Sequence, residues 1–332
     1  MVEYDAILSD FPKLDGEAGD EGRIIRAAES CERGVLYIPG GVYEIHSTIE
    51  IRNACSLKLH PNAVLKAVEP MDFVMRYDDD AAYPGMIEEG AWLKPNPDPD
   101  SEYWNPFITG GIFDGNGLAS CLVLNNFKHF TLRDISLRNG KKFGLLTTEP
   151  GTHWTYELVA QNIYCKCTMP GLGGNTAICL NDGDNHLVDC ICVDYTIGFD
   201  LTGGGSNRLT RCHVWGGPIP PRKEGELPEM LNGSINYRLT SGDALLTDCY
   251  ADTGKIGYEI NDMARLIGCS YYNNYQYKMD DVTVIRHTAG QLLVTNCVFR
   301  QHSPHATMYD GTEETRKQVV WQNNLLEGGL TF

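Results

Sequence analysis

One short unit recurs seven times along the chain and constrains the fold more than any other feature. Its central position is occupied by Ile135, Ile163, Cys190, Cys212, Cys249, Cys269 and Cys297. The repeats follow at intervals of about 20 to 40 residues, a period typical of solenoids. Stacked coils place equivalent residues about 4.8 Å apart. The repeat therefore predicts an inward ladder of small apolar side chains, in which the cysteines are packing groups and not disulfides.

The cysteines and the charge also bear on the setting of the protein. Twelve cysteines kept as free thiols favour a reducing compartment, and residues 1–5 lack the basic and apolar regions of a secretory signal. We therefore predict a cytoplasmic protein. A formal charge of −17 argues against nucleic acid as a partner, and against a bare polyuronate unless a cation or a basic patch reverses the field. No stretch reaches the ~18 apolar residues of a membrane span, so no membrane partner is expected.

A second strand follows the first in each coil, and its residues alternate. Two columns are predicted to face inward and one outward. The first inward column is Leu145, Ile178, Phe199, Tyr237 and Tyr258, the second is Thr147, Leu180, Leu201, Leu239 and Ile260, and the outward column is Leu146, Cys179, Asp200, Arg238 and Glu259. Residues 282–287 continue the series in a register that is ambiguous by one residue, and such a slip exchanges the two faces.

Three segments resemble a known superfamily. Residues 19–22, a helical stretch at 23–33 and the strand-like residues 34–43 are similar to the start of the pectate-lyase-like right-handed parallel β-helices. Residues 108–117 resemble a coil of the polygalacturonase-like and tailspike-like members. Independently, Asp20 is a suitable helix N-cap and Gly34 a suitable stop.

The resemblance implies an all-β, single-stranded, right-handed parallel β-helix with a short capping helix at 20–33. We predict a single domain over residues 1–332, with roughly ten coils. Residues 72–106 and 217–235 interrupt the coil rhythm and are predicted to be long loop insertions. Loops of this length are often functional walls or oligomer contacts.

The catalytic motifs of polygalacturonases are missing. Where that family carries Asn-Thr-Asp and an Asp pair, this chain has residues 175–177 (Asn-Thr-Ala) and 196–198 (Thr-Ile-Gly). There is no Gly-His-Gly, and residues 286–288 (Arg-His-Thr) do not match the family's basic tripeptide. A hydrolase on this frame would use other carboxylates.

Asp200 and Glu259 are the candidate acid and base. They lie two coils apart on the outward column, so their Cα atoms are expected about 9 to 10 Å apart, with Arg238 between them to position the substrate. A carboxylate separation of about 6.5 to 9.5 Å suits inverting hydrolysis. Under this hypothesis, Asp200→Asn or Glu259→Gln abolishes turnover without unfolding the protein. The alternative is a salt-bridged surface ladder with no catalytic role.

Two further sets border this row. Asp182, Asp184 and Asp262 would complete an acid cluster, hold a cation such as Ca²⁺ or make turn hydrogen bonds. Lys278, Arg286 and His287 would bind a uronate substrate, with Tyr277, Asp280 and Asp281 near them. Ion pairing at a coil corner is the alternative for this second set.

The other outward face is unusually apolar for a solvated surface. It includes Tyr164, Ile191, Val193, Trp215, Tyr250 and Tyr272. Burial in a homotrimer, as in tailspike-like proteins, is one explanation, and sugar stacking on Trp215 is the other. His213 lies in the same face as a substrate-binding candidate or a packed histidine.

These observations predict a carbohydrate-active enzyme that binds an oligosaccharide or polysaccharide. The first hypothesis is a glycoside hydrolase that cleaves a neutral or weakly charged oligosaccharide with paired carboxylates and no cofactor. The second is a polysaccharide lyase acting on a uronic-acid glycan by β-elimination, for which Ca²⁺ is a candidate cofactor. The third is a non-catalytic, glycan-binding or structural β-helix of the phage type.

Overall fold

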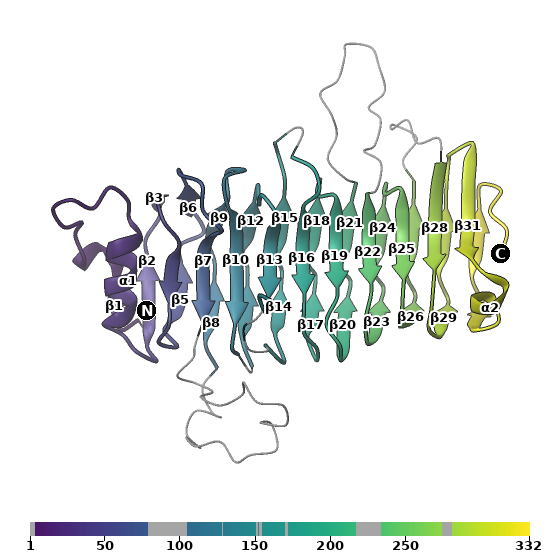
Figure 1. Ribbon diagram of the computed structural model, residues 1–332, viewed down its shortest axis with the longest axis horizontal. Coiled ribbons are helices and arrows are strands. Elements are labelled where there is room, and N and C mark those ends of the chain that lie inside the picture. Colours follow the sequence, from purple (N-terminus) through teal and green to yellow (C-terminus); the bar gives the residue numbers. More distant parts are fainter. Residues whose placement is uncertain are drawn as a thin grey trace, which may run out of the picture. The chain divides into compact units, whose positions relative to one another are not determined.

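The computed structural model describes residues 4–78, 105–127, 129–150, 152, 155–169, 172–216, 234–273 and 281–332. The chain forms two compact units, Met1–Tyr164 and Cys165–Phe332. In each unit short strands run parallel in three sheets, which we name A, B and C (Figure 1). Each coil adds one strand to sheet A, then one to B and one to C. The predicted right-handed parallel β-helix is confirmed.

The first unit has the following strands. In sheet A they are β1 (Ala6–Ile7), β2 (Val35–Ile38), β5 (Ser56–Leu59), β8 (Phe107–Thr109), β11 (Thr131–Arg133) and β14 (Val159–Gln161). In sheet B they are β3 (Gly41–Ile45), β6 (Ala63–Ala67), β9 (Ile112–Asp114) and β12 (Ser136–Arg138). In sheet C they are β4 (Ile49–Ile51), β7 (Phe73–Asp78), β10 (Ser120–Asn125) and β13 (Phe143–Thr147). Strand β15 (Tyr164–Lys166) crosses the boundary between the units.

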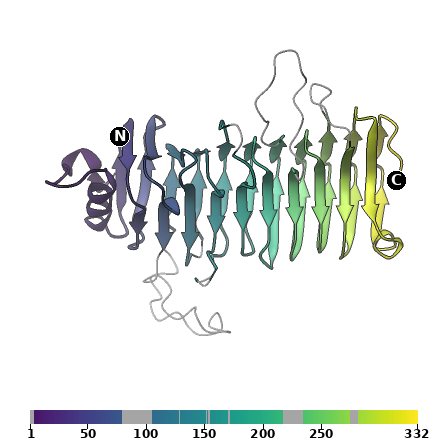
Figure 2. The same cartoon turned by 45° about the horizontal axis from the view of Figure 1, so that its top comes forward.

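The second unit repeats the pattern (Figure 2). Its sheet A contains β17 (His186–Val188), β20 (Ser206–Thr210), β23 (Asp243–Thr247), β26 (Met263–Ile267), β29 (Leu292–Thr295) and β32 (Val319–Gln322). Its sheet B contains β18 (Ile191–Val193), β21 (His213–Trp215), β24 (Tyr250–Asp252), β27 (Ser270–Tyr272), β30 (Val298–Arg300) and β33 (Leu325–Glu327). Its sheet C contains β16 (Thr176–Leu180), β19 (Ile197–Leu201), β22 (Ile235–Leu239), β25 (Ile256–Ile260), β28 (Asp281–His287) and β31 (His305–Gly311). A short helix, α2 (Glu313–Arg316), lies between β31 and β32.

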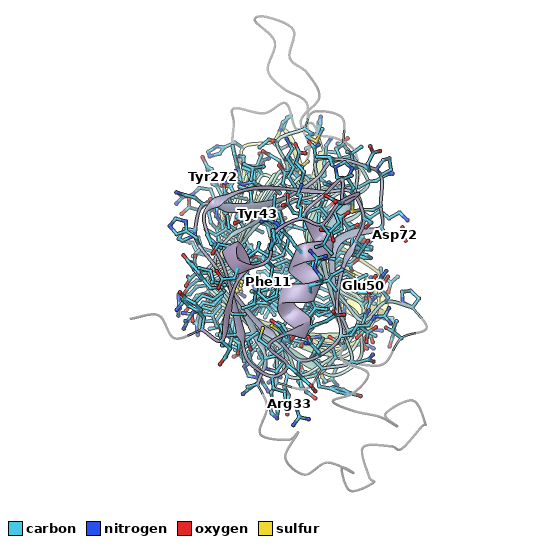
Figure 3. The ribbon with its side chains drawn as sticks, turned by 90° about the vertical axis from the view of Figure 1, so that its left-hand side faces the viewer. Phe11, Arg33, Tyr43, Glu50, Asp72 and Tyr272 are labelled. Atoms are coloured by element: carbon cyan, nitrogen blue, oxygen red, sulfur yellow. The ribbon has the colours of Figure 1, made fainter. Side chains whose placement is uncertain are left out.

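The capping helix is shorter than predicted. Helix α1 spans Glu21–Glu29 and lies across the end of the first unit (Figure 3). Asp20 occupies the N-cap position as predicted, but its side chain does not cap the helix, because its carboxylate accepts hydrogen bonds from the Glu44 backbone N–H and from Arg23. The helix ends at Glu29, with Ser30 as its C-cap and before Gly34, and Arg33 takes the left-handed conformation with φ 55°. No helix of the described residues is long and apolar enough to span a membrane.

The repeated cysteine position lies at the corner between sheets A and B, and not within a strand as its pattern had implied. The residue before it takes a left-handed φ, as at Asp189 (55°), Asp248 (52°) and Asn296 (56°). Asp and Asn tolerate this conformation better than most residues, which explains why they precede the ladder. All twelve cysteines are free and buried, so the prediction of an inward thiol ladder is confirmed.

The two inward columns of sheet C are also confirmed. Every predicted inward residue is buried, and the ring of Tyr237 stacks between those of Phe199 and Tyr258, with centroids 5.3 and 5.2 Å away. A buried tyrosine hydroxyl needs a hydrogen-bond partner. The Tyr237 hydroxyl donates to the Cys212 carbonyl and the Tyr258 hydroxyl to the Ser270 carbonyl.

The two predicted insertions lie largely outside the described residues. Of residues 72–106, the structure describes 72–78, which include strand β7, together with 105–106. Of residues 217–235 it describes only Ser234 and Ile235, and Ile235 begins strand β22.

Candidate functional site

The outward column of sheet C in the second unit is a ladder of ion pairs. On successive strands of this sheet, each residue of the column is paired in register with the next, in the order Cys179, Asp200, Arg238, Glu259, Arg286 and Asp310. Asp200 is only 3% exposed, although its column faces outward. The Arg238 guanidinium binds both carboxylate oxygens of Asp200, and this pairing raises the pKa of Arg238.

The ladder continues beyond Asp200. Arg286 lies between two acids, with its Nη1 3.5 Å from Glu259 Oε1 and its Nε 3.1 Å from Asp310 Oδ2. These contacts are those expected of the salt-bridged alternative. Because both oxygens of Asp200 are engaged and buried, they are poorly placed to meet a sugar, and its assignment as an acid or base stays a prediction.

The acidic residues near the ladder make turn contacts. Asp182 is 2% exposed and accepts a hydrogen bond from the Asn185 side chain at 2.8 Å. Asp184 is exposed, and its Oδ1 accepts a hydrogen bond from the Ser206 backbone N–H at 3.4 Å. Asp262 accepts the N–H groups of Gly242 and Met263, each at 2.9 Å. Within the described part of the chain, no group of three His, Cys, Asp or Glu residues is arranged to hold a metal ion.

The predicted basic set is divided by the structure. Lys278, with Tyr277 and Asp280, lies outside the described residues. Arg286 faces outward, as described above. His287 does not: it is 1% exposed, because the register turns its ring inward, where Nδ1 contacts the Tyr309 hydroxyl and Nε2 the Gly290 carbonyl, each at 2.9 Å. His287 is therefore a packed residue in the structure and not a surface substrate contact.

The outward face of sheet B in the second unit holds a compact polar and aromatic cluster. Register places His213 on β21 beside Tyr250 on β24, and Trp215 beside Asp252. The rings of His213 and Tyr250 stack with centroids 4.7 Å apart and planes 9° apart. The Tyr250 hydroxyl donates to Asp252 Oδ2 at 3.2 Å, and His213 Nε2 lies 3.9 Å from the same oxygen. We call His213, Tyr250 and Asp252 the sheet B cluster.

Burial shifts the pKa of His213 in one direction and those of Tyr250 and Asp252 in the other. Burial lowers the pKa of His213 below its ordinary 6.5, against the opposing charge of Asp252. Burial also raises the pKa of Tyr250 and, despite hydrogen bonds from Thr253 and Tyr250, that of Asp252. A neutral imidazole next to a protonated phenol is a base beside an acid. His213 Nε2 is buried and has no hydrogen-bond partner among the described residues.

Further groups surround the cluster on the same face. Tyr272 and Arg300 continue the column of Trp215 and Asp252 on the next strands, and Figure 3 shows Tyr272 at the outer surface. Arg300 is half-exposed, pairs with Glu327, and has a charge that acts to lower the pKa of Tyr250. On the other side of Trp215, Asp194 lies 3.6 Å from Lys166, and burial raises the pKa of Asp194.

Sequence reasoning placed His213, Trp215 and Tyr250 on this face but gave no catalytic role to Tyr250, Asp252 or Asp194. Their signal was present, because a histidine, a tyrosine and an aspartate occupied adjacent outward positions of neighbouring repeats. It also missed an ion-pair group in the first unit, where Arg76 binds Glu50 and Glu149. That group lies across coils of unequal length, which no fixed repeat spacing reveals.

The comparisons with known proteins show the fold. No protein-family model and no curated protein sequence matches the chain. The A-module of a mannuronan C-5 epimerase from Azotobacter vinelandii aligns over 99% of this chain and 98% of its own, with a TM-score of 0.64 and 12% identity. ORF18 of Geobacillus virus E2 aligns over 97% of this chain, with a TM-score of 0.60 and 15% identity, and this chain covers 60% of its length. An alginate lyase from a Paenibacillus species aligns over 94% of this chain and 97% of its own, with a TM-score of 0.51 and 9% identity.

Proposed function

We propose that the protein is a polysaccharide lyase that cleaves a uronic-acid-containing glycan by β-elimination at the sheet B cluster. The observation that carries the proposal is the stacked pair of His213 and Tyr250, whose pKa values are shifted in opposite directions. Elimination needs a base to remove the proton from C5, next to the carboxylate, and an acid to protonate the oxygen that leaves C4. Two of the similar structures, an epimerase named for C-5 of mannuronan and an alginate lyase, support this chemistry on the same fold.

The orientation of the two rings favours elimination over inversion at C5. His213 and Tyr250 occupy register-paired positions on adjacent strands and project from the same face of sheet B. Both groups therefore reach a bound sugar from one side. Inversion at C5 removes a proton from one face of the ring and returns one to the other, whereas syn elimination uses a base and an acid on the same face. In this proposal the His213 imidazole, whose side chain is 32% exposed although its Nε2 is buried, takes the C5 proton, and Tyr250 protonates the departing O4.

The substrate carboxylate needs a cation against the overall charge of −17. Arg300 is the side chain proposed for this role, because it is half-exposed on the face of the cluster and near enough for its charge to act on Tyr250. Neutralising the carboxylate makes the C5 proton more acidic and so lowers the barrier to its removal. Trp215 offers an aromatic surface beside Asp252 for the apolar face of a neighbouring sugar.

The pKa shifts predict the pH dependence of the reaction. The base form of His213 is present above its lowered pKa, so kcat/KM should rise with pH through an apparent pKa below 6.5. The acid form of Tyr250 persists above the ordinary tyrosine value, because its pKa is raised, so no loss is expected below about pH 10. Initial rates across this range check the prediction. An acidic limb centred above pH 6.5 would contradict the role of His213.

The product test separates the lyase from its alternatives. The purified protein is incubated with polymannuronate, polyguluronate, polygalacturonate and neutral glucans, and both ultraviolet absorbance and new reducing ends are measured. A lyase yields one unsaturated uronate, and hence one increment of absorbance, for each new reducing end. Reducing ends without absorbance would establish a hydrolase. Inversion at C5 without chain cleavage, seen by NMR, would establish an epimerase, and binding without any product would favour the non-catalytic hypothesis.

Hydrolysis of a neutral or weakly charged glycan is the second candidate, and one observation favours it. Asp252 is paired with Trp215 on one neighbouring strand, Asp194 follows Val193, which pairs with Trp215 on the other, and burial raises the pKa of both carboxyl groups. A carboxyl group with a raised pKa is the general acid of a glycosidase. This pair, and not the ion-paired Asp200, would then supply the acid. If hydrolytic products appear, Asp194→Asn and Asp252→Asn are the variants to compare with Asp200→Asn and Glu259→Gln.

A further inference from the structure

Two cysteines of the first unit face each other directly. Cys31 follows the end of helix α1, Cys55 precedes strand β5, and their sulfur atoms are 3.3 Å apart. The thiols of the corner ladder donate to backbone carbonyls of neighbouring coils, as Cys249 does to Leu209 and Cys269 to Leu246, and Cys249 also contacts the thiols of Cys212 and Cys269. Cys31 and Cys55 do not occupy the repeated ladder position, so their contact is separate from the ladder.

The backbone around the pair is already held in place. The Arg33 N–H donates to the Asn53 carbonyl at 3.3 Å, and the Ser56 N–H to the Gly34 carbonyl at 2.8 Å. The Asn53 side chain also donates to the Ala28 carbonyl within α1 at 2.7 Å. A disulfide has an S–S distance of about 2.05 Å, so the two sulfurs need to approach by only about 1 Å. The backbone hydrogen bonds before and after the two cysteines hold the two segments next to each other. The remaining movement is therefore expected to come from rotation of the Cys31 and Cys55 side chains.

We infer that Cys31 and Cys55 are a disulfide-forming site, which a small-molecule disulfide oxidant such as oxidised glutathione closes to link the capping helix to the first coil. This inference is independent of the catalytic proposal.

The chemistry is two successive thiol–disulfide exchanges. Cys31, which is 6% exposed against 0% for Cys55, attacks first. Its thiolate attacks one sulfur of oxidised glutathione, which breaks the glutathione S–S bond, forms a mixed disulfide on Cys31 and releases one glutathione thiolate. The Cys55 thiolate then attacks Cys31 Sγ and releases the second glutathione. Two protein thiols are oxidised, one glutathione disulfide is reduced to two thiols, and the two protein protons pass to the departing thiolates or to solvent.

The rate and the consequence of closure follow from the same environment. Burial raises the pKa of both thiols, so closure should be slow at neutral pH and faster as the pH rises. The link joins residues 24 positions apart and restricts the unfolded chain. Because it ties α1, which lies across the end of the unit (Figure 3), it should raise the Tm by several degrees, and dithiothreitol should reverse the gain.

The test uses the full, reduced chain. The protein is incubated with oxidised glutathione at pH 7 and pH 9, denatured, alkylated with iodoacetamide and digested for mass spectrometry. We expect a cross-linked pair of peptides that contain Cys31 and Cys55, with the other cysteines alkylated and faster formation at pH 9. Cys31→Ser should abolish both the cross-link and the gain in Tm, whereas Cys121→Ser, at another buried cysteine of the first unit, should leave both unchanged.

Three outcomes would overturn the inference. The first is alkylation of all twelve cysteines after oxidant exposure. The second is a stable mixed disulfide of glutathione on Cys31, which would show that Cys55 cannot reach it. The third is a cross-link between ladder cysteines that forms at the same rate. Because Cys31 lies at the edge of the core, Cys31→Ser should fold, and its Tm in the reduced state checks this directly.

Discussion

Replacing His213 by glutamine is expected to lower kcat on a uronate polymer by about 10²- to 10⁴-fold, the contribution typical of a general base. Glutamine is close in size to the imidazole and can still pack against Tyr250, but it cannot accept the C5 proton. KM should change little, because the proposed role of His213 is in proton transfer and not in binding. The residual activity should also lose the acidic limb of the pH profile, since the group that produces this limb is absent.

A matched control is available on a different sheet. His186 lies exposed on β17, in sheet A of the same unit, and His186→Gln should leave kcat, KM and Tm unchanged. Tyr250→Phe should lower kcat while retaining the ring that stacks on His213. Full activity of His213→Gln on the substrate that the wild-type protein cleaves would remove the sheet B cluster as the active site. It would return attention to Asp200 and Glu259.

Replacing Arg238 by methionine is expected to destabilise the protein by about 3 kcal/mol, because it leaves the Asp200 carboxylate buried without its cation. The side chain of Asp200 is 5% exposed and that of Arg238 is 32% exposed. Urea unfolding of wild type and variant measures the difference. The double variant Asp200→Leu/Arg238→Met should recover most of the loss, since it removes the buried charge together with its partner.

A second arginine provides the matched control for burial. Arg211 binds Asp189 with two hydrogen bonds of 2.8 Å, but these side chains are 56% and 41% exposed. Arg211→Met should therefore shift the unfolding midpoint much less than Arg238→Met does. Equal losses at the two sites would contradict a structural role for the Asp200 pair. If Asp200→Asn instead abolishes turnover and leaves the unfolding midpoint unchanged, the original assignment of Asp200 as a catalytic acid or base would be supported.

The sequence by itself determined the coil, the identity of the buried columns and the outward position of most candidate residues. The repeat is sufficient for this because stacked parallel strands force equivalent residues into register, and strict alternation assigns each residue to a face. Phe199, Tyr237 and Tyr258 were thus assigned correctly to the interior. The ambiguous register at His287 shows the limit of the argument, since one residue of slip moves a side chain from the surface to the core.

Only the tertiary structure decided which outward side chains meet. Alternation predicts that Asp200 and Arg238 face outward from one sheet, and Tyr250 and Asp252 from another. It does not predict that Arg238 binds the Asp200 carboxylate, or that the Tyr250 hydroxyl donates to Asp252 beside His213. Nor does it show that the cysteine column lies at a corner, or that Cys31 approaches Cys55. The physical reason is that periodicity specifies the direction of a side chain, whereas pairing and pKa depend on rotamers, burial and neighbours from coils of unequal length.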